Sequence, residues 1–510
     1  MIYRYFLTRA FTLLTFLCSS AMGQTPVGQS IPGRFLITYR NGAIPAAAES
    51  DARAAGGRLV TRHETLGIAI VQAPAAQAAQ IKARLAANPD IASIVEDRVV
   101  AAHSIQVRAA SVSAATPDAL YNSPQGWAVQ QVGGYGSTSR PGPWNVTTGA
   151  GVRIAILDSG VDANHPDIAP NLALNLSEVD QSSATGLPSA CDDGSPQDQQ
   201  GHGTWTASLA AAAAGPGTGL VVGVAPNAAI LNIKVLERMP SATTSAADPT
   251  GCVAGEASGL LSWVLAGIED AVAQRADIIS LSLGTLVDIT TGDGAGLQAT
   301  FDQVTHAAAN AGVILIASAG NDGFNLGNQR YVELPAQSRD VLTIVASTNP
   351  ACAENLASTA TCIAGPVTLP YYSNFGTPLN ALAAPGGSYP AGPDSDITVA
   401  SGWIWGACSE GVAGTVSGVP GVAGQSLGCF GLGHTAYVQA MGTSASAPLV
   451  AGAAALLRSA NPTWSAATVV AALRSSAVNI PTLPVPQVDV TNLIAPHAPH
   501  MQHIVVPSQR

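Results

Sequence analysis

Short apolar runs recur along the chain beyond residue 150, separated by longer alanine-rich stretches. The runs are Val152 to Leu157, Ala229 to Val235, Asp277 to Leu283, Val313 to Ala317 and Val341 to Ala346. Each run has the length of a buried strand, and segments of helical pattern lie between the runs. The alternation predicts an α/β fold in which helices cover both faces of a parallel sheet.

A smaller pattern precedes this unit. Strand-like runs at 35–39, 58–61, 67–72 and 91–96 alternate with helical segments at 46–55 and 75–87. The order strand, helix, strand, strand, helix, strand is typical of ferredoxin-like α+β units. We therefore expect two folded units, at 33–100 and 119–490, joined by an exposed linker at 101–118 that is rich in Ala, Ser and Val. The final segment, 491–510, shows no clear element.

Residues 1–23 have the pattern of a secretory signal. Arg4 and Arg9 precede an apolar stretch that ends at Leu17, and small residues up to Gly23 follow. The apolar stretch is too short to span a membrane, and Leu17 is too large to precede a lipidated Cys18. We expect export without a membrane anchor, to the extracellular space or, in a Gram-negative host, to the periplasm.

Six cysteines remain after removal of the signal: Cys191, Cys252, Cys352, Cys362, Cys408 and Cys429. An even number in an exported chain predicts disulfides, although six cysteines allow fifteen pairings. Proximity in the sequence favours Cys352 with Cys362 and Cys408 with Cys429. The remaining pair would be Cys191 with Cys252.

The charge balance excludes one class of partner. The chain has 21 basic and 32 acidic residues, a net charge of −11, which argues against binding to nucleic acid. No C-x-x-C or H-E-x-x-H pattern indicates zinc. We assign no metal site.

Three short motifs supply an acid, a base and a nucleophile. Asp158 lies in ILDSGVD at the end of an apolar run, and His202 lies in GHGTWTA before a small-residue helical stretch. Ser444 lies in MGTSASAPLVAG at the start of an alanine- and leucine-rich helix. A serine hydroxyl needs an imidazole to accept its proton and a carboxylate to orient that imidazole. At a helix N-terminus, Ser444 would also have a free backbone N–H.

Each motif alone has a plainer interpretation. An isolated DSG is usually a turn, a GHG histidine usually lies in a loop, and a GTS before a helix is usually an N-cap. Ser426, in GQSLG, matches the G-x-S-x-G pattern of esterases. That pattern needs a strand before it and a helix after it, whereas Ser426 lies in a glycine-rich stretch between Cys408 and Cys429. We expect Ser426 not to be catalytic and His165, which follows Asp158, to be structural.

The three motifs, in the order Asp, His, Ser, together resemble those of subtilisin-like serine peptidases (subtilases, S8), over about residues 120 to 490. The resemblance implies a secreted endopeptidase that cuts proteins or peptides through an acyl-enzyme. Asp158 would orient His202, His202 would act as general base and then general acid, and Ser444 would be the nucleophile. The motif ASAGN is similar to the family segment whose asparagine, here Asn321, donates to the oxyanion beside the Ser444 N–H.

The same resemblance implies where substrate binds. The strand at 278–284, which includes Ser282, Leu283 and Gly284, is similar to the family strand that lines the primary pocket, and Ala319 and Gly320 would form the opposite wall. Small residues on both walls predict an open pocket that tolerates large apolar side chains at P1, the residue before the cut bond. The unit at 33–100 resembles inhibitor I9 propeptides, which assist folding and then inhibit. Maturation would occur within 101–118.

Two other functions fit the same motifs. A subtilase-fold peptide ligase or cyclase would have all of these residues, and a non-catalytic peptide-binding relative would have lost one of the four parts that this chain keeps. The chemistry requires no cofactor. A structural calcium ion has no support, because the segment before Ser373 lacks the aspartate that some relatives use. We expect a monomer whose own propeptide inhibits it.

Overall fold

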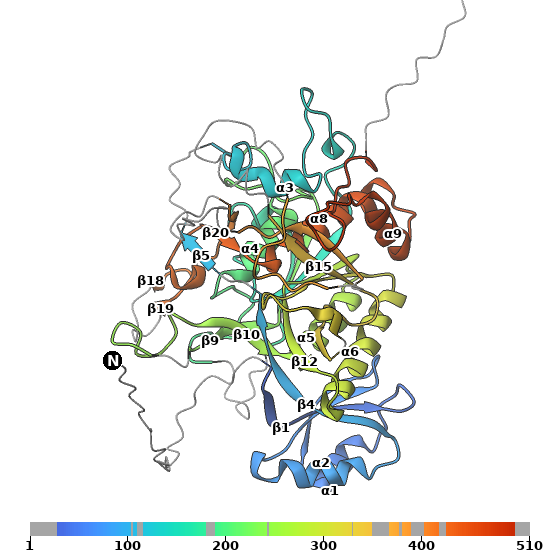
Figure 1. The fold of residues 1–510 in the computed structure, drawn as a ribbon. Coiled ribbons are helices and arrows are strands. Elements are labelled where there is room, and N and C mark those ends of the chain that lie inside the picture. The colour runs from blue at the N-terminus through green and yellow to red at the C-terminus, as the bar shows by residue number, and fades with distance from the viewer. Residues whose placement is uncertain are drawn as a thin grey trace, which may run out of the picture.

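The computed structural model describes residues 28–103, 106–109, 116–179, 189–241, 244–328, 330–348, 367–376, 380–388, 402–417 and 425–494. Figure 1 shows a large unit above a smaller N-terminal unit drawn in blue. The expected signal at 1–23 lies outside the described residues, as do Cys352 and Cys362. Of the expected tail, only 491–494 are described.

The large unit is built on a parallel sheet of seven strands in the order β16-β15-β13-β11-β6-β8-β7. Its strands are β6 (Arg153–Asp158), β7 (Leu172–Ser177), β8 (Ala229–Lys234), β11 (Ile278–Leu281), β13 (Ile314–Ser318), β15 (Val341–Ser347) and β16 (Ala381–Pro385). The five apolar runs of the sequence form β6, β8, β11, β13 and β15. The predicted parallel sheet is confirmed.

Helices cover both faces of this sheet, as predicted. They are α4 (His202–Ala211), α8 (Thr443–Ala460) and α9 (Ala466–Ser476) on one face, and α5 (Leu261–Ala273) and α6 (Gly292–Asn310) on the other. Side chains of a strand alternate between its two faces. Accordingly Ile154 and Ile156 of β6 pack with α4 and α8, whereas Ala155 and Leu157 pack with α5 and α6.

The N-terminal unit has its elements in the order expected from the sequence. They are β1 (Ser30–Tyr39), α1 (Ala48–Ala55), β2 (Arg58–His63), β3 (Ile68–Gln72), α2 (Ala78–Ala86) and β4 (Ile91–Ala102). The strands form an antiparallel sheet in the order β4-β1-β3-β2. One face of this sheet packs on α1 and α2. The other packs on α5 and α6 of the large unit, where Ile70 and Val95 share a core with Leu297 and Phe301.

Two stretches within 101–118 are paired in sheets, unlike the exposed linker expected there. Strand β4 continues to Ala102, and its end lies between β10 (Glu256–Leu260) and β12 (Leu283–Asp288), antiparallel to both. A second strand, β5 (Gln106–Ala109), pairs with β20 (Tyr437–Met441). Both stretches are held by their partners, because sheet edges offer unpaired N–H and C=O groups that an extended chain satisfies.

Short elements complete the described part of the chain. They are the helix α3 (Trp127–Gln131), the strands β9 (Leu236–Met239), β14 (Tyr331–Leu334), β17 (Ile404–Ala407), β18 (Val416–Ser417) and β19 (Gln425–Ser426), and 3-10 turns at Ala75–Gln77, Pro124–Gly126, Pro143–Asn145, Ala169–Asn171, Leu326–Asn328 and Cys429–Gly431. Ser426 thus lies in a two-residue strand with no α-helix directly after it, which is not the setting of an esterase nucleophile.

Two of the three expected disulfides are confirmed: Cys191 bonds to Cys252 and Cys408 bonds to Cys429. All four of these cysteines are buried. The third expected pair lies outside the described residues. Across the described part of the chain, every helix is too short or too polar to cross a bilayer.

A buried ion pair lies at the junction of the two units. Arg34 Nε and Asp97 Oδ2 are 3.0 Å apart, and both residues are at least 98% buried. Asp97 also accepts the backbone N–H of Ser262, on α5, at 3.1 Å. Burial raises the pKa of Asp97, and the Arg34 guanidinium opposes that shift.

We predict that Asp97→Ala lowers the free energy of unfolding by about 3–5 kcal/mol, because it removes the carboxylate that neutralises a buried cation. The control is Glu49→Ala, which breaks an exposed pair with Arg53 and should cost about 0–1 kcal/mol. Urea unfolding of both variants, in a Ser444→Ala background that prevents self-digestion, measures the difference. Equal losses would show that the buried pair adds nothing.

Candidate active site

The carboxyl end of β6 and the first residue of α4 bring an acid and an imidazole together. Asp158 Oδ1 is 2.7 Å from His202 Nδ1, and both residues are fully buried. The carboxylate also accepts the Ser159 N–H at 2.7 Å and the Thr206 hydroxyl at 3.2 Å. These bonds fix the carboxylate, so that Nδ1–H of His202 donates to it and Nε2 is left to act as a base.

Asp198 fixes the loop that precedes His202. The sequence analysis did not identify Asp198. Its carboxylate accepts bonds from the N–H groups of Gln200, Gly201 and Thr204, and from the hydroxyls of Ser159 and Thr204, at 2.6–3.0 Å. Burial raises the pKa of Asp198, and these donors lower it. Asp198 lies four residues before His202 and accepts the N–H of Thr204 in the first turn of α4. This is a helix-capping pattern, and the sequence DQQGHGT contains it.

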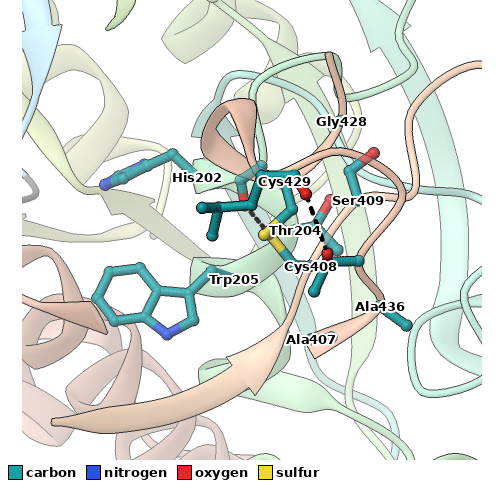
Figure 2. Close-up of a disulfide and its surroundings, with 12 residues drawn as sticks. His202, Thr204, Trp205, Ala407, Cys408, Ser409, Gly428, Cys429 and Ala436 are labelled. Carbon is teal, nitrogen blue, oxygen red and sulfur yellow. Dashed lines mark hydrogen bonds between the residues drawn. A yellow bond between two sulfur atoms is a disulfide. The ribbon is translucent and has the colours of Figure 1, made fainter. Parts of the chain in front are cut away.

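The disulfide Cys408–Cys429 packs behind this loop. Figure 2 shows it beside His202 and Trp205. Gly201 has a φ of 109°, and a Cβ there would lie 2.9 Å from Cys408 Sγ, so the position requires glycine. The Trp205 ring lies edge-on to the imidazole with 5.9 Å between ring centroids, and its Nε1 donates to the Ile404 carbonyl at 3.3 Å.

Ser444 is the second residue of α8 and is fully buried. Its hydroxyl donates to the Ser282 carbonyl at 3.2 Å, and the Ser282 hydroxyl donates to the Ser444 carbonyl at 2.9 Å. That carbonyl is available because Pro448, four residues on, has no N–H to bond it. Pro448 itself lies inside α8.

Ser444 and His202 belong to helices that pack against each other. They are not joined by a hydrogen bond here, because the Ser444 hydroxyl points to Ser282. Among the described residues, His202 Nε2 has no hydrogen-bond partner. The structure thus links Asp158 to His202 directly, and the Ser444 hydroxyl is bonded to Ser282 instead of to the imidazole.

Asn321 lies beside Thr443, the first residue of α8. Its Oδ1 accepts the N–H and the hydroxyl of Thr443, both at 2.9 Å. This fixes the amide so that Nδ2 points the other way, where it donates to the carbonyl of His103. An amide that donates to a peptide carbonyl can also donate to the negative charge that a tetrahedral intermediate places on that oxygen.

Residues 99–103 fill the cleft as an extended strand. Val99 to Ala101 pair with β10, Ala101 and Ala102 pair with β12, and the His103 N–H donates to the Ser282 carbonyl at 3.1 Å. Of the expected substrate-binding residues, Ser282, Leu283 and Gly284 all lie along this strand. Paired on both sides, the strand has the conformation in which a peptide substrate is held.

The side chain of His103 lies against Gly284, Ser318 and Glu333, and the space that it occupies is called the primary pocket below. Its Nδ1 is 2.7 Å from Ser318 Oγ, and its Nε2 is 3.1 Å from Glu333 Oε1. A Cβ on Gly284 would lie 2.2 Å from Glu333 Oε1, so this glycine leaves room for the pocket. A Cβ on Gly320 would first meet Asn374 Nδ2, at 2.3 Å.

Two residues near the pocket differ in what their side chains meet. The Ala319 side chain packs with Val345 and Ala383 in a separate buried cluster, because side chains alternate along the chain after β13. Glu333 places an acid beside the small residues expected there, and it is 1% exposed. Sequence analysis missed Glu333.

His165 has a structural role, as expected. Its Nε2 bonds to the Ala436 carbonyl at 2.8 Å, and its Nδ1 accepts the Asp167 N–H at 3.1 Å. Within the described ranges, no three His, Cys, Asp or Glu side chains gather in a way that could hold a metal ion.

Comparisons with known proteins point in one direction. A family model described as the subtilase family matches residues 149–501. Thermitase of Thermoactinomyces vulgaris is 34% identical over 208 residues, which are 41% of this chain and 59% of that protein. Subtilisin of Bacillus pumilus is 31% identical over 330 residues, which are 65% of this chain and 85% of that protein. The chain spans only slightly more than half the length of thermitase.

Solved structures share the fold. The epidermin leader peptide processing serine protease of Staphylococcus aureus has a TM-score of 0.61 at 18% identity, over 90% of this chain and 97% of that one. Fervidolysin of Fervidobacterium pennivorans has a TM-score of 0.58 at 19% identity, over 92% of this chain and 62% of that one. Because the family model matches more than half of the sequence, this chain belongs to the subtilase family.

Proposed function

We propose that the chain is a serine endopeptidase, made as a proenzyme that cuts itself. The observation that carries this proposal is the strand at 99–103, which lies in the cleft with the His103 carbonyl on the Asn321 amide. Asp158, His202 and Ser444 supply the acid, base and nucleophile of acyl transfer.

In the first half of the reaction, the Ser444 hydroxyl turns from Ser282 toward His202 Nε2, which takes its proton. Oγ then adds to the carbonyl carbon of the P1 residue. The resulting oxyanion accepts hydrogen bonds from Asn321 Nδ2 and from the Ser444 N–H, which has no partner within the helix at this position. Asp158 stabilises the imidazolium that forms on His202.

In the second half, His202 gives the proton to the leaving amine, and the peptide bond breaks to leave an acyl ester on Ser444. Water then enters, His202 accepts its proton, and addition followed by collapse releases the carboxylate product and the free serine. Every proton passes through His202 Nε2, the atom that has no hydrogen-bond partner among the described residues.

The N-terminal unit serves as the propeptide, and the bond after His103 is its maturation site. Before the cut, residues 99–103 are the substrate. After it, the same strand is a product that remains paired with β10 and β12 and blocks the cleft. The packing of this unit on α5 and α6 supports its role as an inhibitor that fits its own protease.

We also propose that the proenzyme is exported. The pattern of residues 1–23 supports this. So do the two disulfides, since such bonds persist in oxidising compartments.

A serine-directed phosphonyl or sulfonyl reagent should inactivate the enzyme by labelling Ser444. The reagent needs a hydroxyl that has a base nearby, and the setting of Ser444 meets this condition. Peptide mapping by mass spectrometry locates the label. A label on Ser426 would overturn the assignment of the nucleophile.

Ser444→Ala should accumulate as the uncut proenzyme, because it lacks the hydroxyl that attacks the bond after His103 in the proposed reaction. Wild type should instead show a new N-terminus at Ser104. Intact mass and N-terminal sequencing, in a host without other proteases, distinguish the two. If the variant matures normally, self-processing is ruled out.

Asn321→Ala should lower kcat by roughly 10²–10³ and leave KM nearly unchanged, because the donor meets a charge that exists only in the transition state. That magnitude is the one found for such a donor in a subtilisin. Thr443→Val, which removes only one of the two bonds to Asn321 Oδ1, should cause a smaller fall. A rise in KM with unchanged kcat would instead show that Asn321 contributes to binding of the substrate in its ground state.

A further inference from the structure

We infer that Glu333 makes the primary pocket select a basic side chain at P1: histidine in the precursor of this enzyme, and histidine, lysine or arginine in other substrates. The inference rests on the proposed function, since it names the substrate class of the same site. It replaces the large apolar P1 residue that the small pocket walls suggested.

The first argument is the state of Glu333. Its carboxylate is almost completely buried. Apart from the His103 ring, 3.1 Å away, no donor among the described residues reaches either oxygen. A buried acid normally needs fixed donors or a counter-ion, because desolvation disfavours its charge. Here the group that meets the Glu333 carboxylate is the His103 ring. This ring belongs to the strand in the cleft and leaves together with that strand.

The second argument is what His103 meets at its other nitrogen. Nδ1 faces Ser318 Oγ at 2.7 Å, and that hydroxyl lies 3.4 Å from the Leu281 carbonyl, to which it can donate. Both ring nitrogens of His103 therefore face oxygen atoms, so a polar group holds the ring at each nitrogen.

The third argument is the charge around the pocket. Asp322 is close enough to Glu333 to raise the pKa of that carboxyl, in addition to the larger effect of burial, whereas His103 lowers it. The two acids make the local potential negative, so a cation at P1 is attracted and an acidic side chain is repelled.

The pocket wall at Gly284 leaves space for the Glu333 carboxylate. A side chain on Gly284 would collide with both the Glu333 carboxylate and the His103 ring. Gly284 also pairs with Ala101 on the strand in the cleft, so it adjoins the bound chain. The glycine thus leaves the space in which the carboxylate and the P1 side chain meet.

The test uses the mature enzyme and a set of peptides that differ only at P1: His against Phe, Lys against Met, and Arg against Gln. Wild type should cleave each basic peptide with a kcat/KM roughly 10²-fold above that of its neutral partner, and Glu333→Gln should remove the difference, as truncation of one partner of a buried charge pair typically does. Cleavage of the Phe peptide should rise in Glu333→Gln.

The control is Asp340→Asn. It removes the same charge from an exposed residue that precedes β15, at the opposite edge of the sheet from the site, and it should keep the preference for basic residues. Labelling of Ser444 by the serine reagent, measured on every variant, reports the catalytic machinery separately. If Ser444 reacts and peptides are cut without preference for basic P1 residues, the inference fails while the proposed function stands.

A second measurement uses the precursor itself. His103→Phe should slow self-cleavage when Glu333 is present and should have little effect in Glu333→Gln, since the two side chains act as one pair. The rate of loss of the uncut chain gives both effects. If the two substitutions slow cleavage independently, so that their effects multiply, the pairing of Glu333 with P1 is disproved.

Discussion

The common direction of the strands is the constraint on which the site depends. All seven strands of the central sheet are parallel, so their carboxyl ends meet at one edge. Asp158 ends β6, Ser282 follows β11 and Ser318 ends β13. The helices that begin at this edge, α4 and α8, carry His202 and Ser444 in their first two residues. Residues far apart in the sequence are thereby gathered at this edge.

The parts of the site that sequence could predict are those with a local pattern. Asp158, His202 and Ser444 each lie where an apolar run changes to a loop or a helix begins, and Asn321 follows the same kind of change after β13. Glu333 has no such signal. The residues YVELP give an ordinary short strand, and the carboxylate reaches the pocket only because β14 pairs with β12, far away in the sequence. The strand pairing of 101–102 and of 106–109 was missed for the same reason, since the partners are β10, β12 and β20.

The buried acids of this chain differ in how their charge is met. Asp158 and Asp198 accept several fixed donors from the backbone and from hydroxyls. Asp97 has the Arg34 guanidinium. Those three therefore stabilise a defined local structure. Glu333 has no comparable fixed donor among the described residues, so its burial stabilises no particular arrangement of its own surroundings. Asp97, Asp158 and Asp198 thus support the scaffold, whereas Glu333 has the properties of an acid that binds a ligand.

In the proposed protease, Ser282 connects substrate recognition to catalysis through its hydrogen bonds. Its carbonyl accepts both the backbone N–H of the bound strand and the hydroxyl of Ser444, and its own hydroxyl holds the carbonyl that Pro448 leaves without a helical partner. A peptide that binds out of register therefore displaces Ser282, the residue to which the Ser444 hydroxyl is bonded. Since a displacement of about 1 Å can cost two orders of magnitude in rate, this joint penalises poorly aligned peptides at the chemical step as well as at binding.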